Sequence, residues 1–177
     1  MQPGRVETLS YLLELGADAS ATCQAGASPL HLAAQSASAA AVSVLLKANP
    51  AIDAADDRGW TALHHAAHGG GVDVLDALLS AGAACRVCSE EGLTPLHLAV
   101  CSAQAVQRLL DAGADRLALD GCGCTAAHYA AQLGDHDAFS RLCKEGDVVP
   151  DDVHGACSRS VWSDLEGMQR VCSVFCF

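Results

Sequence analysis

Histidine and cysteine are the side chains through which this sequence could do chemistry: it holds eight histidines and ten cysteines. His64 and His68 are four positions apart, so on a helix their rings would lie on one side, as in a zinc-binding pair. A metalloprotease motif of the His-Glu-x-x-His type would need a glutamate directly after the first histidine. That position holds His65, so we expect no catalytic residues.

Two cysteine motifs, Cys85-x-x-Cys88 and Cys122-x-Cys124, fall close to turns. If successive turns stack, four sulfur atoms could converge, and zinc would need them in a tetrahedron at about 2.3 Å. The Cys-x-Cys spacing suits that geometry poorly, so we expect no metal and no cofactor. The N-terminus lacks the pattern of an export signal, and we therefore expect free thiols in a reducing compartment. A cysteine-based metal or redox protein is kept as an alternative.

Other catalytic patterns are missing from the sequence. Gly69-Gly70-Gly71 is not followed by the Lys-Ser or Lys-Thr pair of a phosphate-binding loop, and no Gly-x-Ser-x-Gly sequence occurs. The acidic pairs Asp56-Asp57 and Glu90-Glu91 are adjacent in sequence, whereas paired catalytic carboxylates face each other across a cleft. We expect a protein that is not an enzyme.

Most of these residues lie within a stretch that recurs along the chain. One copy reads Gly59-Trp60-Thr61-Ala62-Leu63-His64, and copies begin at Gly26, Gly59, Gly92 and Gly123. The first two intervals are equal, and the third is shorter by two positions. A second landmark follows in phase, as Leu12-Leu13, Leu45-Leu46, Leu78-Leu79, Leu109-Leu110 and Leu142-Cys143. A fixed period of roughly 33 residues indicates an array of stacked repeats.

With these motifs the chain resembles the ankyrin repeat family, whose unit of about 33 residues has a Thr-Pro-Leu-His-x-Ala core. The resemblance implies an all-α solenoid of stacked helix–turn–helix units with short β-hairpin-like turns. It also implies that the motif histidines form hydrogen bonds that tie one unit to the next. These histidines are His31, His64, His97 and His128.

The landmarks divide the chain into units. Residues 1–21 hold the second helix of a partial unit, and four units follow at 22–55, 56–88, 89–119 and 120–152. Residues 153–177 form either a degenerate capping helix or a divergent tail. Unit 89–119 is two residues short, with the missing pair placed between Ala103 and Gln104. We expect a clipped start to its second helix, a local change in curvature and the lowest local stability.

The net charge of −11 disfavours partners with a phosphate backbone, because nucleic-acid-binding proteins usually carry a basic surface. Adsorption to anionic membranes is disfavoured for the same reason. No run of 18 apolar residues occurs, so we expect no membrane insertion. We expect a monomer in the cytoplasm, with the nucleus as the alternative compartment.

The resemblance implies a concave groove, lined by turn tips and first helices, that binds another protein. The expected groove residues are Asp57, Arg58, Trp60, His68, Glu90, Glu91, Leu93, Cys101, Cys122, Cys124, Gln132 and Leu133. Tryptophan is frequent in binding hot spots, and Trp60 with Arg58 and Leu93 would form an apolar centre with an acidic edge. The alternative is that the Trp60 ring folds back over its own turn.

The function predicted from the sequence is that of a non-catalytic protein–protein interaction module, a scaffold or adaptor. The acidic edge of the groove favours a protein segment with basic or mixed charge. A first alternative is a regulatory part of a larger enzyme or channel. The second is the cysteine-based metal or redox protein named above.

Overall fold

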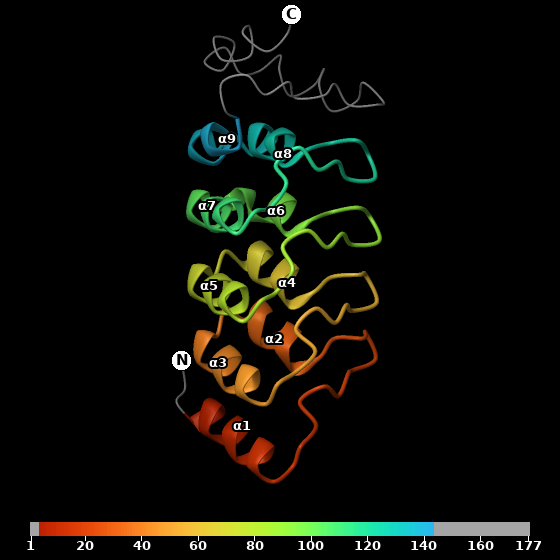
Figure 1. Cartoon of the computed structure of the whole chain (residues 1–177), viewed down its shortest axis with the longest axis vertical. Coiled ribbons are helices and arrows are strands. Elements are labelled where there is room, and N and C mark those ends of the chain that lie inside the picture. The colour runs from red at the N-terminus through yellow and green to blue at the C-terminus, as the bar shows by residue number, and fades with distance from the viewer. Residues whose placement is uncertain (1–3, 144–177) are drawn as a thin grey trace, which may run out of the picture.

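Residues 4–143 are described by the computed structural model of this chain, and they form one elongated stack of helix pairs (Figure 1). The two alternatives for residues 153–177, and the end of the unit at 120–152, lie outside the described residues. The expectation of an all-α solenoid of helix–turn–helix units is confirmed. Between residues 4 and 143 the only β pairing is an isolated bridge between Ala55 and Thr61, at the base of one turn.

Each unit contributes a short first helix and a second helix packed beside it. The stack begins with a lone helix, α1 (Gly4–Glu14). The pairs are α2 (Pro29–Gln35) with α3 (Ala39–Lys47), α4 (Ala62–Gly69) with α5 (Val72–Ser80), α6 (Pro95–Leu98) with α7 (Ala103–Asp111), and α8 (Ala126–Leu133) with α9 (His136–Leu142). The first helices form one layer of the stack and the second helices form another (Figure 1).

Capping residues explain where the first helices begin. Thr61 precedes α4 in an extended conformation, and the backbone N–H of Thr61 donates to Nδ1 of His64 at 3.1 Å. Such a reciprocal cap satisfies backbone N–H groups that a helix start leaves without partners. Pro29 and Pro95 occupy the first position of their helices, where the missing N–H costs no hydrogen bond.

The core is a single cluster that runs the length of the stack. The first helices contribute the fully buried small residues Ala34, Ala66 and Ala130, and Ala99 directly after α6 is buried in the same way. The second helices contribute larger aliphatic side chains, namely Val42, Leu45, Leu75, Leu78, Val106 and Leu109. Alanine lets neighbouring first helices approach closely, and the aliphatic side chains fill the space between the two layers. This burial of apolar surface is the main stabilising term of the stack.

The two missing residues of unit 89–119 shorten its first helix, and the expectation of a clipped second helix is wrong. The second helix, α7, has nine residues, as many as α3 and α5. Helix α6 has four residues and continues as a 3₁₀ turn, Ala99–Cys101. In the other units a left-handed residue lies between the helices, such as Gly70 with φ 66° or Gly134 with φ 70°. The short unit has no room for that residue, so the chain tightens into a 3₁₀ turn that reaches Ser102, the N-cap of α7.

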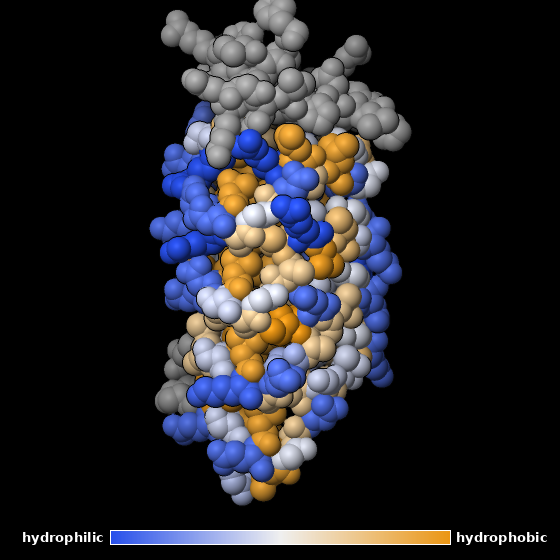
Figure 2. All heavy atoms as spheres, viewed as in Figure 1, coloured by the Kyte–Doolittle hydropathy of each residue, from blue (hydrophilic) through white to orange (hydrophobic). Residues whose placement is uncertain are grey.

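The N-terminal end of the stack exposes apolar side chains. Helix α1 packs against α3 through Leu9 and Leu13. On the same helix Tyr11, Leu12 and Leu15 are 60%, 47% and 66% exposed. Hydrophobic atoms are visible at this lower end of the molecule (Figure 2). The expected partial first unit therefore has an uncovered apolar edge within the part of the chain that the structure describes.

None of the helices in residues 4–143 is both long enough and apolar enough to span a membrane.

Candidate functional site

The turn tips are short hairpins, and in three of them an acidic or hydroxyl side chain, Asp56, Ser89 or Asp120, accepts backbone N–H groups of the tip. In unit 56–88 the N–H of Asp56 donates to the carbonyl oxygen of Trp60 at 2.9 Å. Oδ1 of Asp56 accepts the N–H groups of Arg58 and Trp60, both at 2.9 Å. In unit 120–152, Oδ1 of Asp120 likewise accepts the N–H groups of Cys122 and Cys124, both at 2.8 Å. The backbone of these two tips is thus held by a side chain of the tip itself.

Successive tips are joined by backbone hydrogen bonds. The N–H of Asp57 donates to the carbonyl oxygen of Ala25 at 3.2 Å, and the N–H of Glu90 donates to that of Arg58 at 3.1 Å. The N–H of Gly121 donates to the carbonyl oxygen of Glu91 at 2.8 Å. The four tips therefore form one ladder, and their side chains are presented at fixed spacing.

Glycine is required at the tips because neighbouring tips lie so close. Gly59 has φ +73°, a left-handed conformation that other residues rarely adopt. A Cβ atom added at Gly59 would lie 2.8 Å from the backbone nitrogen of Glu90. The spacing of the ladder therefore depends on glycine having no side chain.

The motif histidines tie each first helix to the turn of the following unit. Nε2 of His64 donates to the carbonyl oxygen of Leu93 at 3.0 Å, and Nε2 of His97 donates to that of Cys124 at 3.1 Å. Nε2 of His31 lies 3.1 Å from the carbonyl oxygen of Trp60. The tie implied by the family resemblance is confirmed for these three histidines. Their rings therefore serve the scaffold.

The hydrogen bonds made by the two ring nitrogens determine the charge of these histidines. Nδ1 of His64 accepts the N–H of Thr61, so the proton of the neutral ring is on Nε2, which donates to Leu93. Burial lowers the pKa of His64, although the hydrogen bond to Leu93 opposes this shift. Burial likewise lowers the pKa of His97. Both rings are therefore neutral at pH 7.

His65, the residue after the motif histidine His64, also stabilises the tip of unit 56–88. Nε2 of His65 donates to Oδ2 of Asp56 at 3.0 Å. Burial lowers the pKa of His65, and the hydrogen bond to Asp56 opposes that shift. Burial alone would raise the pKa of Asp56, but the hydrogen bonds from His65, Trp60 and Arg58 lower it overall. In unit 120–152 the hydroxyl of Tyr129 takes the place of His65 and donates to Asp120 at 2.7 Å.

Trp60 is a buried part of the turn, and the expectation that it forms an exposed apolar centre is corrected. Its side chain is only 9% exposed. The ring stacks on His64 with 6.3 Å between centroids and meets the edges of His65 and His68 at 5.1 and 5.6 Å. The guanidinium carbon of Arg58 lies 4.1 Å above the ring. The alternative, in which the ring folds back over its own turn, describes what the structure shows.

Leu93 and Cys124 are buried for the same reason. Both occupy the position of Trp60 in their units, directly after the tip glycine, and they are 9% and 6% exposed. These buried side chains have little surface to offer a partner. Any effect of Trp60, Leu93 and Cys124 on the binding surface therefore comes from the shape that they give to the turns.

The other predicted groove residues are exposed. On the turn tips these are Asp57, Arg58, Glu90, Glu91 and Cys122. At or next to the ends of the first helices they are His68, Cys101, Gln132 and Leu133. The structure thus offers a charged row on the tips and a less charged row at the helix ends.

The cysteine motifs do not come together as a metal site. Cys124 is buried and Cys122 is exposed, whereas Cys85 directs its Sγ to the carbonyl oxygen of Ala112 at 3.4 Å. Among residues 4–143, no three side chains of His, Cys, Asp or Glu are grouped so that they could hold a metal ion.

The geometry agrees with the sequence comparisons. A family model described as ankyrin repeats, three copies long, matches residues 1–87 and residues 70–152. The chain belongs to the ankyrin-repeat family. Ankyrin repeats are in general protein-interaction modules and are typically not catalytic. A comparison with curated proteins finds no match.

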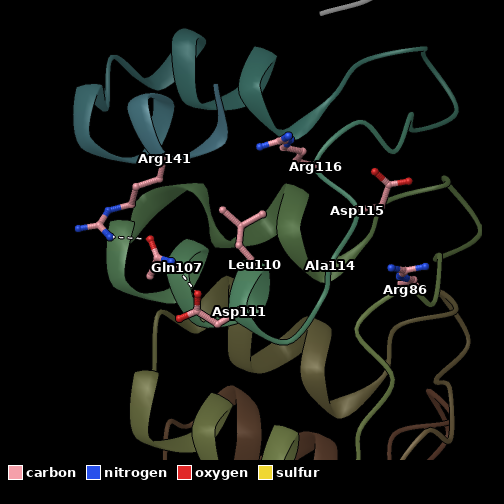
Figure 3. Close-up of a pocket in the computed structure, with 8 residues that line it drawn as sticks. All are labelled: Arg86, Gln107, Leu110, Asp111, Ala114, Asp115, Arg116 and Arg141. Atoms are coloured by element: carbon pink, nitrogen blue, oxygen red, sulfur yellow. Dashed lines mark hydrogen bonds between the residues drawn. The ribbon is translucent and has the colours of Figure 1, made fainter. Parts of the chain in front are cut away.

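One feature of this ankyrin stack was not predicted from the sequence. A hollow lies over α7, α9 and the loop that follows α7, and three arginines line it (Figure 3). These arginines, Arg86, Arg116 and Arg141, are far apart in the sequence and form no local motif. Arg86 has the same position in its unit as Asp53 has in the previous unit. This replacement of an acidic residue by a basic one is the one feature of the sequence that could have indicated the hollow.

Proposed function

We propose that this chain is a non-catalytic protein–protein interaction module that binds a segment of another protein along its turn tips and first-helix ends. The observation that carries the proposal is the ladder of backbone hydrogen bonds between tips, at 2.8 to 3.2 Å. It holds exposed side chains in a fixed row before any partner arrives. Preorganisation of this kind lowers the entropy cost of binding.

The charges of the row favour a partner with basic or mixed charge. Asp57, Glu90 and Glu91 are exposed carboxylates, and Arg58 is held over the Trp60 ring. The chain as a whole carries a net charge of −11, which would steer a basic segment towards it. Complementary charges act mainly on the association rate and on specificity. Binding should therefore weaken as the salt concentration rises.

The proposed binding surface spans four units, with the boundaries 22–55, 56–88, 89–119 and 120–152 expected from the sequence. We propose the cytoplasm as the compartment of the chain, because the cysteine spacing is not that of a disulfide framework, and a monomer as its form at low concentration. Unit 56–88 carries Trp60, whose ring lies under the Arg58 guanidinium, and the first two charged residues of the row, Asp57 and Arg58. We place the centre of the binding surface at the tips of this unit and the next.

The test compares the wild-type protein with the variant Glu90→Lys, Glu91→Lys as bait for interacting proteins in living cells. We expect partners of the wild type to bind the variant at least about tenfold more weakly, because like charges would face each other across the interface. Glu14→Lys is the matched control, since Glu14 is an exposed acid on α1, away from the turns. Trp60→Ala is a poor probe, because its buried ring would change stability as well.

Melting temperatures of both variants within a few degrees of the wild type would show that folding is intact. The proposal fails if the glutamate variant retains the same partners at the same strength. It also fails if Glu14→Lys loses those partners to the same extent.

A further inference from the structure

In two units, the residue directly after the motif histidine reaches the tip of its own unit. In unit 56–88 this residue is His65, whose Nε2 donates to Oδ2 of Asp56 at 3.0 Å. In unit 120–152 it is Tyr129, whose hydroxyl donates to Oδ2 of Asp120 at 2.7 Å. The tips extend beside the layer of first helices (Figure 1). This position therefore lies where a first helix meets its own tip, on the proposed binding surface.

The same position in unit 22–55 carries an uncovered apolar side chain. It holds Leu32, which is 53% exposed, whereas His65 is 7% exposed. The tip of this unit also has smaller residues, since Ala27 occupies the position of Trp60 and Cys23 occupies that of the aspartate. A leucine forms no hydrogen bond with a tip, and about half of its surface stays in contact with water. Covering that surface with an apolar group of a partner would be favourable.

The unit that holds Leu32 adjoins the first charged tip. Nε2 of His31, the residue before Leu32, lies 3.1 Å from the carbonyl oxygen of Trp60 in the next unit. The N–H of Asp57 donates to the carbonyl oxygen of Ala25 at 3.2 Å, so the two tips are in direct contact. A partner segment that covers Leu32 would therefore reach the charged tips with its following residues.

The next two tips carry exposed carboxylates. These belong to Asp57, Glu90 and Glu91. In the part of the chain that the structure describes, none of the three forms an ion pair with a basic side chain. Arg58, on the same tip as Asp57, lies over the Trp60 ring. Along the stack, the binding surface thus changes from apolar at unit 22–55 to acidic at unit 89–119.

We propose that the partner is an extended segment with an apolar side chain that packs on Leu32 and a basic pair that faces Glu90 and Glu91. Stacked helices lie about 8–10 Å apart, and an extended chain advances about 3.3 Å per residue. Two units therefore correspond to about five or six residues between the apolar residue and the basic pair. This inference rests on the proposed function and names the class of partner for the same surface.

The test is a selection of peptides from a random library on the immobilised full chain. The peptides are about 15 residues long, which at about 3.3 Å per residue covers two units with residues to spare. We expect the enriched peptides to share an apolar residue and a lysine or arginine pair about five or six positions away. The order of these two features gives the direction of the bound segment.

Fluorescence anisotropy then measures the affinity of a labelled, enriched peptide for variants of the chain. Leu32→Ser should weaken binding at least about fivefold, because an apolar contact is lost. Leu32→Met should bind within about twofold of the wild type, since methionine keeps the contact apolar. Leu12→Ser is the matched control, because Leu12 is 47% exposed on α1, outside the layer of first helices. This control should bind like the wild type.

A double-mutant cycle shows which residue the apolar side chain of the peptide contacts. Its replacement by serine should weaken binding to the wild type but not further weaken binding to Leu32→Ser, where the contact is already lost. The same replacement should still weaken binding to Glu90→Gln, which keeps Leu32 in place. The serine peptide also tests the contact on the wild-type chain if Leu32→Ser does not fold.

The inference is overturned if the enriched peptides depend on Glu90 and Glu91 but share no apolar residue. It is also overturned if Leu32→Ser and Leu12→Ser weaken binding equally. The proposed function would stand in both cases. If no peptide is enriched, or if the enriched peptides bind the variant Glu90→Lys, Glu91→Lys as tightly as the wild type, the proposed function fails and this inference fails with it.

Discussion

His64 is bonded at both ring nitrogens, and the bond at Nδ1 requires the neutral ring. Nδ1 accepts the N–H of Thr61, and Nε2 donates to the carbonyl oxygen of Leu93. A second proton would have to go on Nδ1, where it would face the N–H of Thr61. The same arrangement occurs at His97, with Thr94 and Cys124. One side chain thus caps its own helix and links two units, in a single protonation state.

This arrangement makes stability depend on pH. Burial lowers the pKa of His64 and of His97 below the value of 6.5 in the unfolded chain, so the unfolded state takes up protons first. We expect the free energy of unfolding to be highest above pH 6.5 and to fall as the pH drops below that value. Asp56 and Asp120, whose pKa values are lowered from 3.8, lose their contribution only as the pH falls below that value.

Urea denaturation at a series of pH values measures this dependence. The variant His64→Gln, His97→Gln should be less stable at pH 7 but should show a flatter slope below pH 6.5, because glutamine does not titrate. Glutamine at this helix position can still cap the backbone. His136→Gln is the control, since His136 is exposed at the start of α9. A slope unchanged by the double substitution would contradict the assignment.

At the scale of elements, the turn tip is the part of each unit that tolerates the least change. Gly59 combines a left-handed backbone with close contact to the next tip, whereas Gly82 has φ +92° but nothing within 4 Å of an added Cβ. The two glycines therefore separate the cost of backbone strain from the cost of a clash. The first helix tolerates more change than the tip. In unit 89–119 it is shorter than in the other units, and the tips stay in register.

We expect Gly82→Ala to lower the free energy of unfolding by about 1–2 kcal/mol, the cost of strain alone. Gly59→Ala should cost about 3 kcal/mol or more, because the added Cβ also forces the Glu90 backbone away from Arg58. Urea denaturation of the two variants measures both values. Equal losses would show that the tips have room to move apart, contrary to the ladder described here.

At the scale of the whole molecule, the stack has interactions mainly between neighbouring units, so its ends matter. Units inside the stack are covered on both sides, but within residues 4–143 α1 packs on one side, against α3 of the following unit. Leu32 of α2 is 53% exposed, although the residue at the same position two units later, Leu98, is only partly exposed. Arrays of this kind usually need a polar outer face at each end.

We expect the N-terminal edge to cause self-association of the chain at high concentration. The variant Leu12→Gln, Leu15→Lys should reduce this association, with a change in folding stability within about 0.5 kcal/mol, because both side chains are exposed. Sedimentation velocity over a concentration series measures the effect. Leu133→Lys is the control, since Leu133 is 58% exposed but lies in α8. If this control suppresses association equally, the N-terminal edge is not responsible.

Much of this molecule follows from the order of its residues. The period of about 33 residues, the capping threonines and the motif histidines predict the helix pairs and the ties between them, because these features act within one unit or between adjacent copies. The exposed row at Asp57, Glu90 and Glu91 also follows, since tips of a stack face solvent. Such features need only local geometry and a regular repeat.

The tertiary structure alone decided the rest. Trp60 could point into the groove or under its turn, and only the packing of three histidine rings and Arg58 around it determines which. Arg86 and Arg141 belong to different repeats and share one hollow because the helices of successive units are stacked. The direction of a side chain and the meeting of distant residues depend on contacts in three dimensions, which spacing along the chain does not contain.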